Sequence, residues 1–279
     1  NEIIKNTCAV GGKAFVMDKG GSFKNLCMTL GGKHINFDFK TQFSLNPFTY
    51  IPEGNSADNQ RDRNSLFTGL VSIVTQMAFP SGSYSDAEHA FLKEAIYQVW
   101  HTKASRGSID DIASYLSSVD DIRAQDIARS IVDFTSKGSF GGFFNPPATI
   151  DIASDLVVVE TDNLEEPLKS VMVMMMMVQV WQRMIGSDRK APYLVLIDEA
   201  WDLLRGKATG DFIEALSLTA RKYRCALGTA TQSLNHYFKD GLTGPQAAWE
   251  NSAWKVVLKQ EDDTLSGLKD HPQLSEFMN

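Results

Sequence analysis

Two acidic residues, Asp198 and Glu199, directly follow an apolar run within YLVLIDEAWDLL, residues 193–204. Side chains alternate along a strand, so adjacent acids at a strand end point in different directions and can take different roles. In nucleotide hydrolases, the first acid of such a pair helps to hold Mg²⁺ and the second polarises the attacking water. The pattern therefore predicts Mg²⁺ held through water by Asp198, with Glu199 as the catalytic base.

A second interpretation of the same pair remains open. Both acids could be solvated residues at the start of the next helix, where the helix dipole favours negative charge. The two interpretations differ in what substitution does, because a cap contributes to stability and a catalytic base contributes to rate.

A polar pair, Thr231 and Gln232, follows the next apolar run in GTATQS, residues 228–233. The carboxyl ends of parallel strands meet at one edge of a sheet, where ligands bind. Gln232 is therefore predicted to hydrogen-bond the γ-phosphate of ATP or the attacking water. The alternative is a helix start capped by Ser233, which is compatible with that role.

Two arginines, Arg221 and Arg224, lie just before that run in ARKYR, residues 220–224. They could be ordinary cations near the negative end of a helix dipole. One of them could instead reach a phosphate across a subunit boundary as an arginine finger, and Arg221 is the first candidate.

The elements that must position these residues form an α/β pattern. Several of the apolar runs lack alternation, which favours strands buried on both faces of a parallel sheet. Helical patterns separate most of them, including residues 167–185 and 211–223. The expected strands are residues 13–18, 33–39, 156–160, 193–198, 225–231 and 254–259.

A long stretch without strand character, residues 56–143, is predicted to be an all-helical insert. Its helix signals are an apolar face within residues 60–77 and capping boxes beginning at Ser85 and Ser108. We therefore expect an α/β core of residues 1–55 and 144–279. The methionine-rich run near residues 170–182 is too short to span a membrane and is expected to be a buried helix, with a methionine face that binds a membrane or a partner as the alternative.

The amino-acid composition argues against several classes of function. With Lys+Arg 27 and Asp+Glu 34, the formal net charge is −7, which argues against bulk binding of nucleic acid. The three cysteines form no CxxC pair and the five histidines no ligand spacing, so a zinc site or a disulfide framework is not expected. Cysteine usage favours a reducing, cytosolic compartment.

Four stretches in this order resemble the motor domain of the conjugative type IV secretion traffic ATPases of the TraC type: VMDKGGSF, SLNPF, YLVLIDEAWDLL and ARKYRCALGTATQS. The resemblance implies a RecA-like P-loop NTPase fold with helices on both faces of its parallel sheet. It also implies ATP and Mg²⁺ as cofactors, Asp198 and Glu199 as the Walker B acids, Gln232 as the sensor and Arg221 as the preceding basic residue. Such proteins are hexamers on the cytoplasmic side of the inner membrane, work with other secretion components, and drive transport or pilus assembly.

One departure from that family is clear: the phosphate-binding motif GxxxxGK[ST], Walker A, occurs nowhere in the 279 residues. We expect the first strand and the phosphate loop to lie upstream of Asn1, the core to be cut at both ends, and these residues to be inactive alone. Two other functions stay open. One is a nucleic-acid translocase of the coupling-protein or DNA-pump type, which the acidic charge disfavours. The other is a non-enzymatic α/β scaffold.

Overall fold

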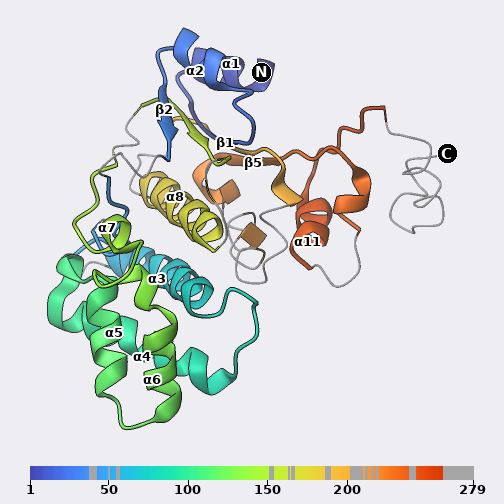
Figure 1. Ribbon diagram of the computed structural model, residues 1–279. Coiled ribbons are helices and arrows are strands. Elements are labelled where there is room, and N and C mark those ends of the chain that lie inside the picture. Colours follow the sequence, from blue (N-terminus) through green and yellow to red (C-terminus); the bar gives the residue numbers. More distant parts are fainter. Residues whose placement is uncertain are drawn as a thin grey trace.

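Five parallel strands form the sheet in the described part of the computed structural model (Figure 1). They are β1 (Lys13–Asp18), β2 (Lys33–Asn36), β3 (Leu156–Glu160), β4 (Tyr193–Ile197) and β5 (Cys225–Thr229), in the spatial order β2-β3-β1-β4-β5. The structure describes residues 1–37, 43–49, 51–54, 57–150, 154–162, 164, 167–185, 190–201, 210, 213–214, 217, 220–238 and 243–259.

The central strands are apolar throughout because helices cover both faces of the sheet. Alternate residues of β1 show this: Phe15 and Met17 belong to one core, and Ala14 and Val16 belong to the other. Register pairing of Val16 with Val158 continues the second core across β3. The predicted two-sided parallel sheet is confirmed.

Different helices build the two cores. On one face lie α1 (Glu2–Ala9) and α2 (Lys24–Thr29), which bury Ile4 and Cys27 against the sheet. On the other lie α8 (Leu168–Ile185) and then α3 (Ala57–Ala78), which pack against each other (Figure 1). The larger core therefore joins the sheet to the insert in one continuous cluster.

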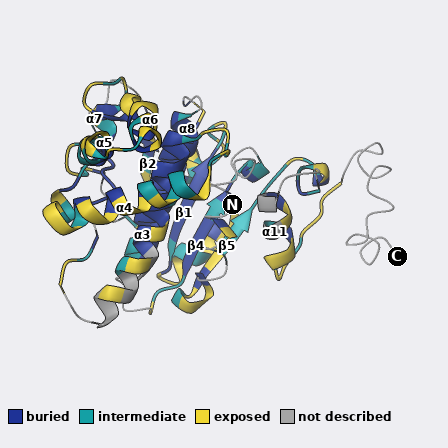
Figure 2. Cartoon of the chain, turned by 90° about the horizontal axis from the view of Figure 1, so that it is seen from below, coloured by how far each residue is buried: buried dark blue, intermediate teal, exposed yellow. Residues whose placement is uncertain are grey.

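The methionine-rich run is the buried helix that was expected. All of its methionines from Met172 to Met177 are at most 1% exposed, and Figure 2 shows α8 in the dark blue of buried residues. Unbranched, polarizable methionine side chains fill the irregular space between the sheet and α3. Within the described residues, no helix is long and apolar enough to cross a membrane.

Every regular element described between β2 and β3 is a helix, and turns and loops connect these helices. After α3 come α4 (Asp86–Lys103), η1 (Ala104–Arg106), α5 (Ile109–Ser118), α6 (Ile122–Ser130), η2 (Val132–Phe134) and α7 (Gly141–Phe144). The predicted capping box of Ser85 with Glu88 is present, and the Ser108 side chain caps α5 by accepting from the Asp111 N–H. The helical character is confirmed, whereas the domain boundaries remain a prediction.

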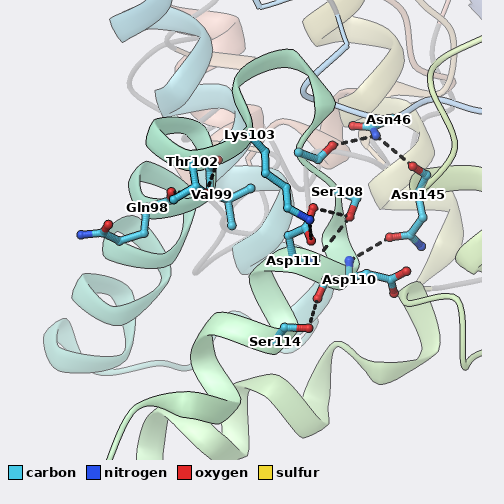
Figure 3. A network of polar contacts seen from close by, with 11 residues as sticks. Asn46, Gln98, Val99, Thr102, Lys103, Ser108, Asp110, Asp111, Ser114 and Asn145 are labelled. Carbon is cyan, nitrogen blue, oxygen red and sulfur yellow. Dashed lines mark hydrogen bonds and ion pairs between the residues drawn. The ribbon is translucent and has the colours of Figure 1, made fainter.

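A buried polar network ties this insert to the chain that enters and leaves it (Figure 3). The Asn46 side-chain amide, 3% exposed, donates to the carbonyls of Gly107 and Asn145. The Asn145 carboxamide oxygen in turn accepts from the Asp110 N–H at the start of α5. The buried Asn46 side chain thus has partners for both its amide nitrogen and its oxygen, as burial of a polar group requires. The SLNPF stretch is the anchor of the insert.

One predicted strand is wrong. Residues 254–259 are described and form no strand, and Trp254 and Val256 are 90% and 84% exposed. A strand exists only by pairing, and none of the described strands pairs with this segment. It follows the C-terminal elements η4 (Leu234–His236) and α11 (Thr243–Asn251).

Other expected elements differ in length. β2 ends at Asn36, β4 at Ile197 and β5 at Thr229, so each is shorter than expected. The helix expected over residues 211–223 falls largely outside the described residues, and its last three form the 3₁₀ turn η3 (Arg221–Tyr223).

Candidate functional site

Asp198 and Glu199 lie where the sequence placed them, immediately after β4 at the carboxyl edge of the sheet. Backbone hydrogen bonds hold this point from both sides. The Asp198 N–H donates to the Met17 carbonyl of β1 at 2.9 Å, and the Ala200 N–H donates to the Ala230 carbonyl after β5 at 3.0 Å. The two acids are therefore held between two neighbouring strand ends.

Asp198 is a half-buried carboxylate that carries an electrostatic cost. Desolvation by burial raises its pKa above the usual value, and the negative charges of Glu199 and Asp18 add to the rise. Hydrogen bonds from the backbone N–H groups of Glu199 and Lys19 oppose it. A carboxylate kept in like-charge surroundings is well suited to attract a divalent cation.

Glu199 has an unusual backbone conformation, with φ at +50°. This left-handed region costs a non-glycine residue on the order of 1 kcal/mol or more and persists only where the surroundings impose it. Here the flanking hydrogen bonds impose it, and the indole Nε1–H of Trp201 donates to Glu199 Oε2 at 2.5 Å.

Two further acids that the sequence reasoning did not single out lie at the same edge. Asp18 ends β1 and Glu160 ends β3, and the two are register partners. Asp18 is fully buried and accepts from the N–H groups of Ser22 at 3.1 Å and Phe23 at 2.7 Å. Glu160 accepts from the Gly20 N–H at 3.3 Å.

These two acids shape the loop after β1. The glycines in it, Gly20 and Gly21, have φ values of +93° and +68°, which explains the glycine pair in VMDKGGSF. Each of these two apolar runs ends in an acidic residue, and this pattern in the sequence could have revealed Asp18 and Glu160. Their partners are backbone N–H groups, so their observed role is to hold the loop.

The end of β5 supplies the other side of the site. The Ala230 N–H donates to the Ile197 carbonyl, so residues after β5 lie beside the end of β4. Thr231 Oγ1 and His236 Nδ1 share a hydrogen bond of 2.6 Å. Gln232 is exposed at this edge, and Ser233 caps η4 by accepting from the Asn235 N–H. Ser233 therefore caps a helix, as the alternative interpretation predicted, and Gln232 is still exposed beside it.

Arg221 and Arg224 lie at the opposite, amino-terminal end of β5. Arg224 Nη1 donates to the Lys190 carbonyl at 2.7 Å, and the Tyr193 N–H donates to the Arg224 carbonyl. Arg221 is exposed, and its side chain makes no hydrogen bond or ion pair within the described residues. The structure therefore does not bring either arginine to the acids of its own chain.

The acids fit one part of a magnesium–nucleotide site. No group of three possible ligands from His, Cys, Asp and Glu that could hold a metal is found among the described residues. Mg²⁺ needs no such group, since it is usually bound by one or two carboxylates together with phosphates and several waters. Asp198 at the strand end meets that requirement. The cradle for the phosphates themselves is a motif that the 279 residues lack.

The sequence matches the model of a known family over almost its whole length: the TraG P-loop domain matches residues 1–266. The chain belongs to this P-loop family. It is 30% identical over 277 residues to Protein TraC of Escherichia coli strain K12, an alignment that covers 92% of the chain and 30% of TraC. The chain thus spans less than a third of that relative, and the resemblance to the TraC type is confirmed.

Solved structures agree on the fold. VirB4 of Thermoanaerobacter pseudethanolicus superposes with a TM-score of 0.76 at 18% identity, over 99% of this chain and 77% of that one. The plasmid coupling protein TrwB in complex with a non-hydrolysable ATP analogue gives 0.57 at 13% identity, covering 90% and 64%. These similarities confirm the RecA-like P-loop fold class predicted from the sequence.

Proposed function

We propose that this TraG-family chain is part of an ATP-hydrolysing motor that powers conjugative type IV secretion and pilus assembly. The observation that carries the proposal is Glu199, held at positive φ directly after Asp198 between the ends of β1 and β5. A solvated helix cap requires no such strained and doubly tied backbone. The family and the TrwB complex with ADP and Mg²⁺ support the same chemistry.

In this proposal each residue has one role. Asp198 holds Mg²⁺ through water, and the ion, when bound, neutralises charge on the phosphates. Glu199 accepts the proton of the attacking water, and Gln232 at the adjacent strand end orients that water or the γ-phosphate. Arg221 reaches the γ-phosphate of a neighbouring subunit, because its own sheet separates it from the acids.

The phosphate cradle must come from residues outside the 279, because the printed sequence has no Walker A motif. The outer edge of β5 supports this, because a further strand could pair there. Among the described strands β4 is the only neighbour of β5, and most residues of β5 are only half-buried. We further propose a hexamer on the cytoplasmic face of the inner membrane, working with other secretion components, with residues 56–143 as a separate helical insert.

The alternatives are less well supported. A nucleic-acid translocase of the coupling-protein type shares the fold, as TrwB does, but the net charge of −7 is the wrong sign for binding a phosphate backbone. A non-enzymatic scaffold gives no reason for two acids held at the carboxyl edge of the sheet.

Substitution of the two acids in the complete protein that carries this chain tests the proposal. Glu199→Gln should lower turnover by about 10²–10⁴ while ATP binding stays near wild type. Asp198→Asn should weaken binding of Mg²⁺-ATP as well as turnover. Glu214→Gln, at an exposed glutamate to which the proposal gives no role, is the matched control.

Single-turnover hydrolysis and nucleotide-binding isotherms separate the two interpretations of the acid pair. A helix cap predicts equal losses below about 1 kcal/mol of stability and nearly intact turnover for both variants. That result would reject the catalytic interpretation.

A further inference from the structure

A chain of side-chain contacts connects Glu199 to the end of the neighbouring strand β5. Its first link is the hydrogen bond from Trp201 Nε1 to Glu199 Oε2 at 2.5 Å. The second is the stacking of the Trp201 and His236 rings, whose centroids lie 4.3 Å apart with an interplanar angle of 26°. The third is the 2.6 Å hydrogen bond between His236 Nδ1 and Thr231 Oγ1.

A contact from a third strand end reaches the same indole. Lys19 Nζ, in the loop after β1, lies 6.0 Å from the centroid of the Trp201 ring, at the outer limit of a cation–π contact. Trp201 therefore collects contacts from the ends of β1, β4 and β5, the three strands whose ends surround the acid pair.

The hydrogen bond constrains only one oxygen of the carboxylate. Glu199 Oε1 accepts no hydrogen bond from the part of the chain that the structure describes. The indole N–H thus holds the carboxylate by Oε2 and leaves Oε1 available for a proton. A glutamate side chain has several rotatable bonds, so holding one oxygen selects a single position for the other.

We infer that Trp201 is the positioning residue for Glu199 and that His236 supports it by stacking. This inference rests on the proposed function, because it assigns Glu199 the role of base. Trp201 itself touches neither water nor nucleotide in this scheme. It sets the position of the carboxylate relative to Thr231, the residue directly before Gln232.

Conservative variants of the complete ATP-hydrolysing protein test the indole hydrogen bond. Trp201→Phe keeps an aromatic ring that can stack on His236, removes the N–H donor and replaces the indole with a smaller ring, a size change that the control below shares. We expect kcat to fall about 10- to 100-fold, the usual effect of losing a group that orients a functional residue, with KM for ATP within about twofold. Trp100→Phe, which alters a half-buried tryptophan of the helical insert, is the matched control and should leave kcat unchanged.

Two substitutions of His236 test the stacking contact with Trp201. His236→Ala removes the ring and should lower kcat in the same direction as Trp201→Phe, whereas His236→Phe keeps the ring and should restore most of it. The double variant Trp201→Phe/His236→Ala should be no slower than the slower single variant, because both act through one carboxylate. Equal losses for His236→Ala and His236→Phe would overturn the role given to the stack.

A double-mutant cycle separates this inference from the proposed function. In a Glu199→Gln background, Trp201→Phe should cause no further loss, since the carboxylate it positions is already gone. If Glu199→Gln alone leaves turnover intact, the proposed function fails. If Glu199→Gln lowers turnover as expected but Trp201→Phe is silent, raises kcat, or is equally harmful in both backgrounds, the positioning role is wrong and the function stands.

Discussion

Asn46 and Asn145 lie 99 positions apart in the sequence and are joined by a hydrogen bond of 3.1 Å from the Asn46 side chain to the Asn145 carbonyl. Asn46 precedes and Asn145 follows the helices from α3 to α7 in the chain. The same Asn46 amide donates to the Gly107 carbonyl at 2.9 Å, and its oxygen accepts from the Phe48 N–H. One buried side chain thus fixes three backbone segments.

Asn46→Ala should lower the free energy of unfolding by about 2–4 kcal/mol, because it leaves several buried backbone groups without partners. Urea unfolding followed by circular dichroism measures the loss. Asn25→Ala, at an exposed position on α2, is the control and should change stability by less than about 0.5 kcal/mol. Similar small changes for both would show that the network does not anchor the insert.

Arg221→Ala in the complete protein should reduce turnover strongly while ATP binding is preserved. An arginine finger contributes about 10³–10⁵ in rate where it has been measured. Mixing Arg221→Ala subunits with Glu199→Gln subunits should recover some activity, because some interfaces then pair an intact arginine with an intact base.

Arg224→Ala should behave differently, since the Arg224 side chain already binds the Lys190 carbonyl within its own chain. We expect a loss of about 1 kcal/mol in stability and a smaller effect on turnover. A larger loss of turnover for Arg224→Ala, together with failure of the mixing experiment for Arg221→Ala, would transfer the role to Arg224.

The buried thiol of Cys225 predicts a stability that depends on pH. Burial raises the pKa of Cys225 from 9.0 to about 12, so the folded state keeps a proton that the unfolded state loses. The free energy of unfolding should therefore fall as pH rises above about 9, by roughly 1 kcal/mol per unit. Urea unfolding at pH 8 and pH 10 should show a smaller fall for Cys225→Ala than for wild type. Cys8→Ala, at a less buried site, should keep a slope closer to wild type.

The 279 residues alone should show negligible ATPase activity and weak nucleotide affinity. The backbone N–H cradle and the lysine of a phosphate loop make the main contacts to the β- and γ-phosphates, and no motif here replaces them. A coupled assay for released phosphate checks this. Saturable hydrolysis that Asp198→Asn abolishes would show that the chain contains a phosphate site of another kind.

The sequence by itself determined the features that depend on local pattern. The apolar runs at β1 and β3 predicted both strands with their observed ends, because burial on both faces leaves a continuous signal. The Ser85 capping box and the buried methionine helix followed from short-range chemistry in the same way. The placement of Asp198 and Glu199 after β4 needed only the length of an apolar run.

The tertiary structure decided what depends on residues distant in the sequence. Pairing of Asp18 with Glu160 and stacking of Trp201 on His236 require the strand order, which no local pattern contains. The parallel pairing of β4 with β5 places Arg221 at the opposite end of these strands from Asp198 and Glu199. The segment at residues 254–259 has the composition of a strand but pairs with no described strand, and strand pairing is a property of the fold, not of local composition.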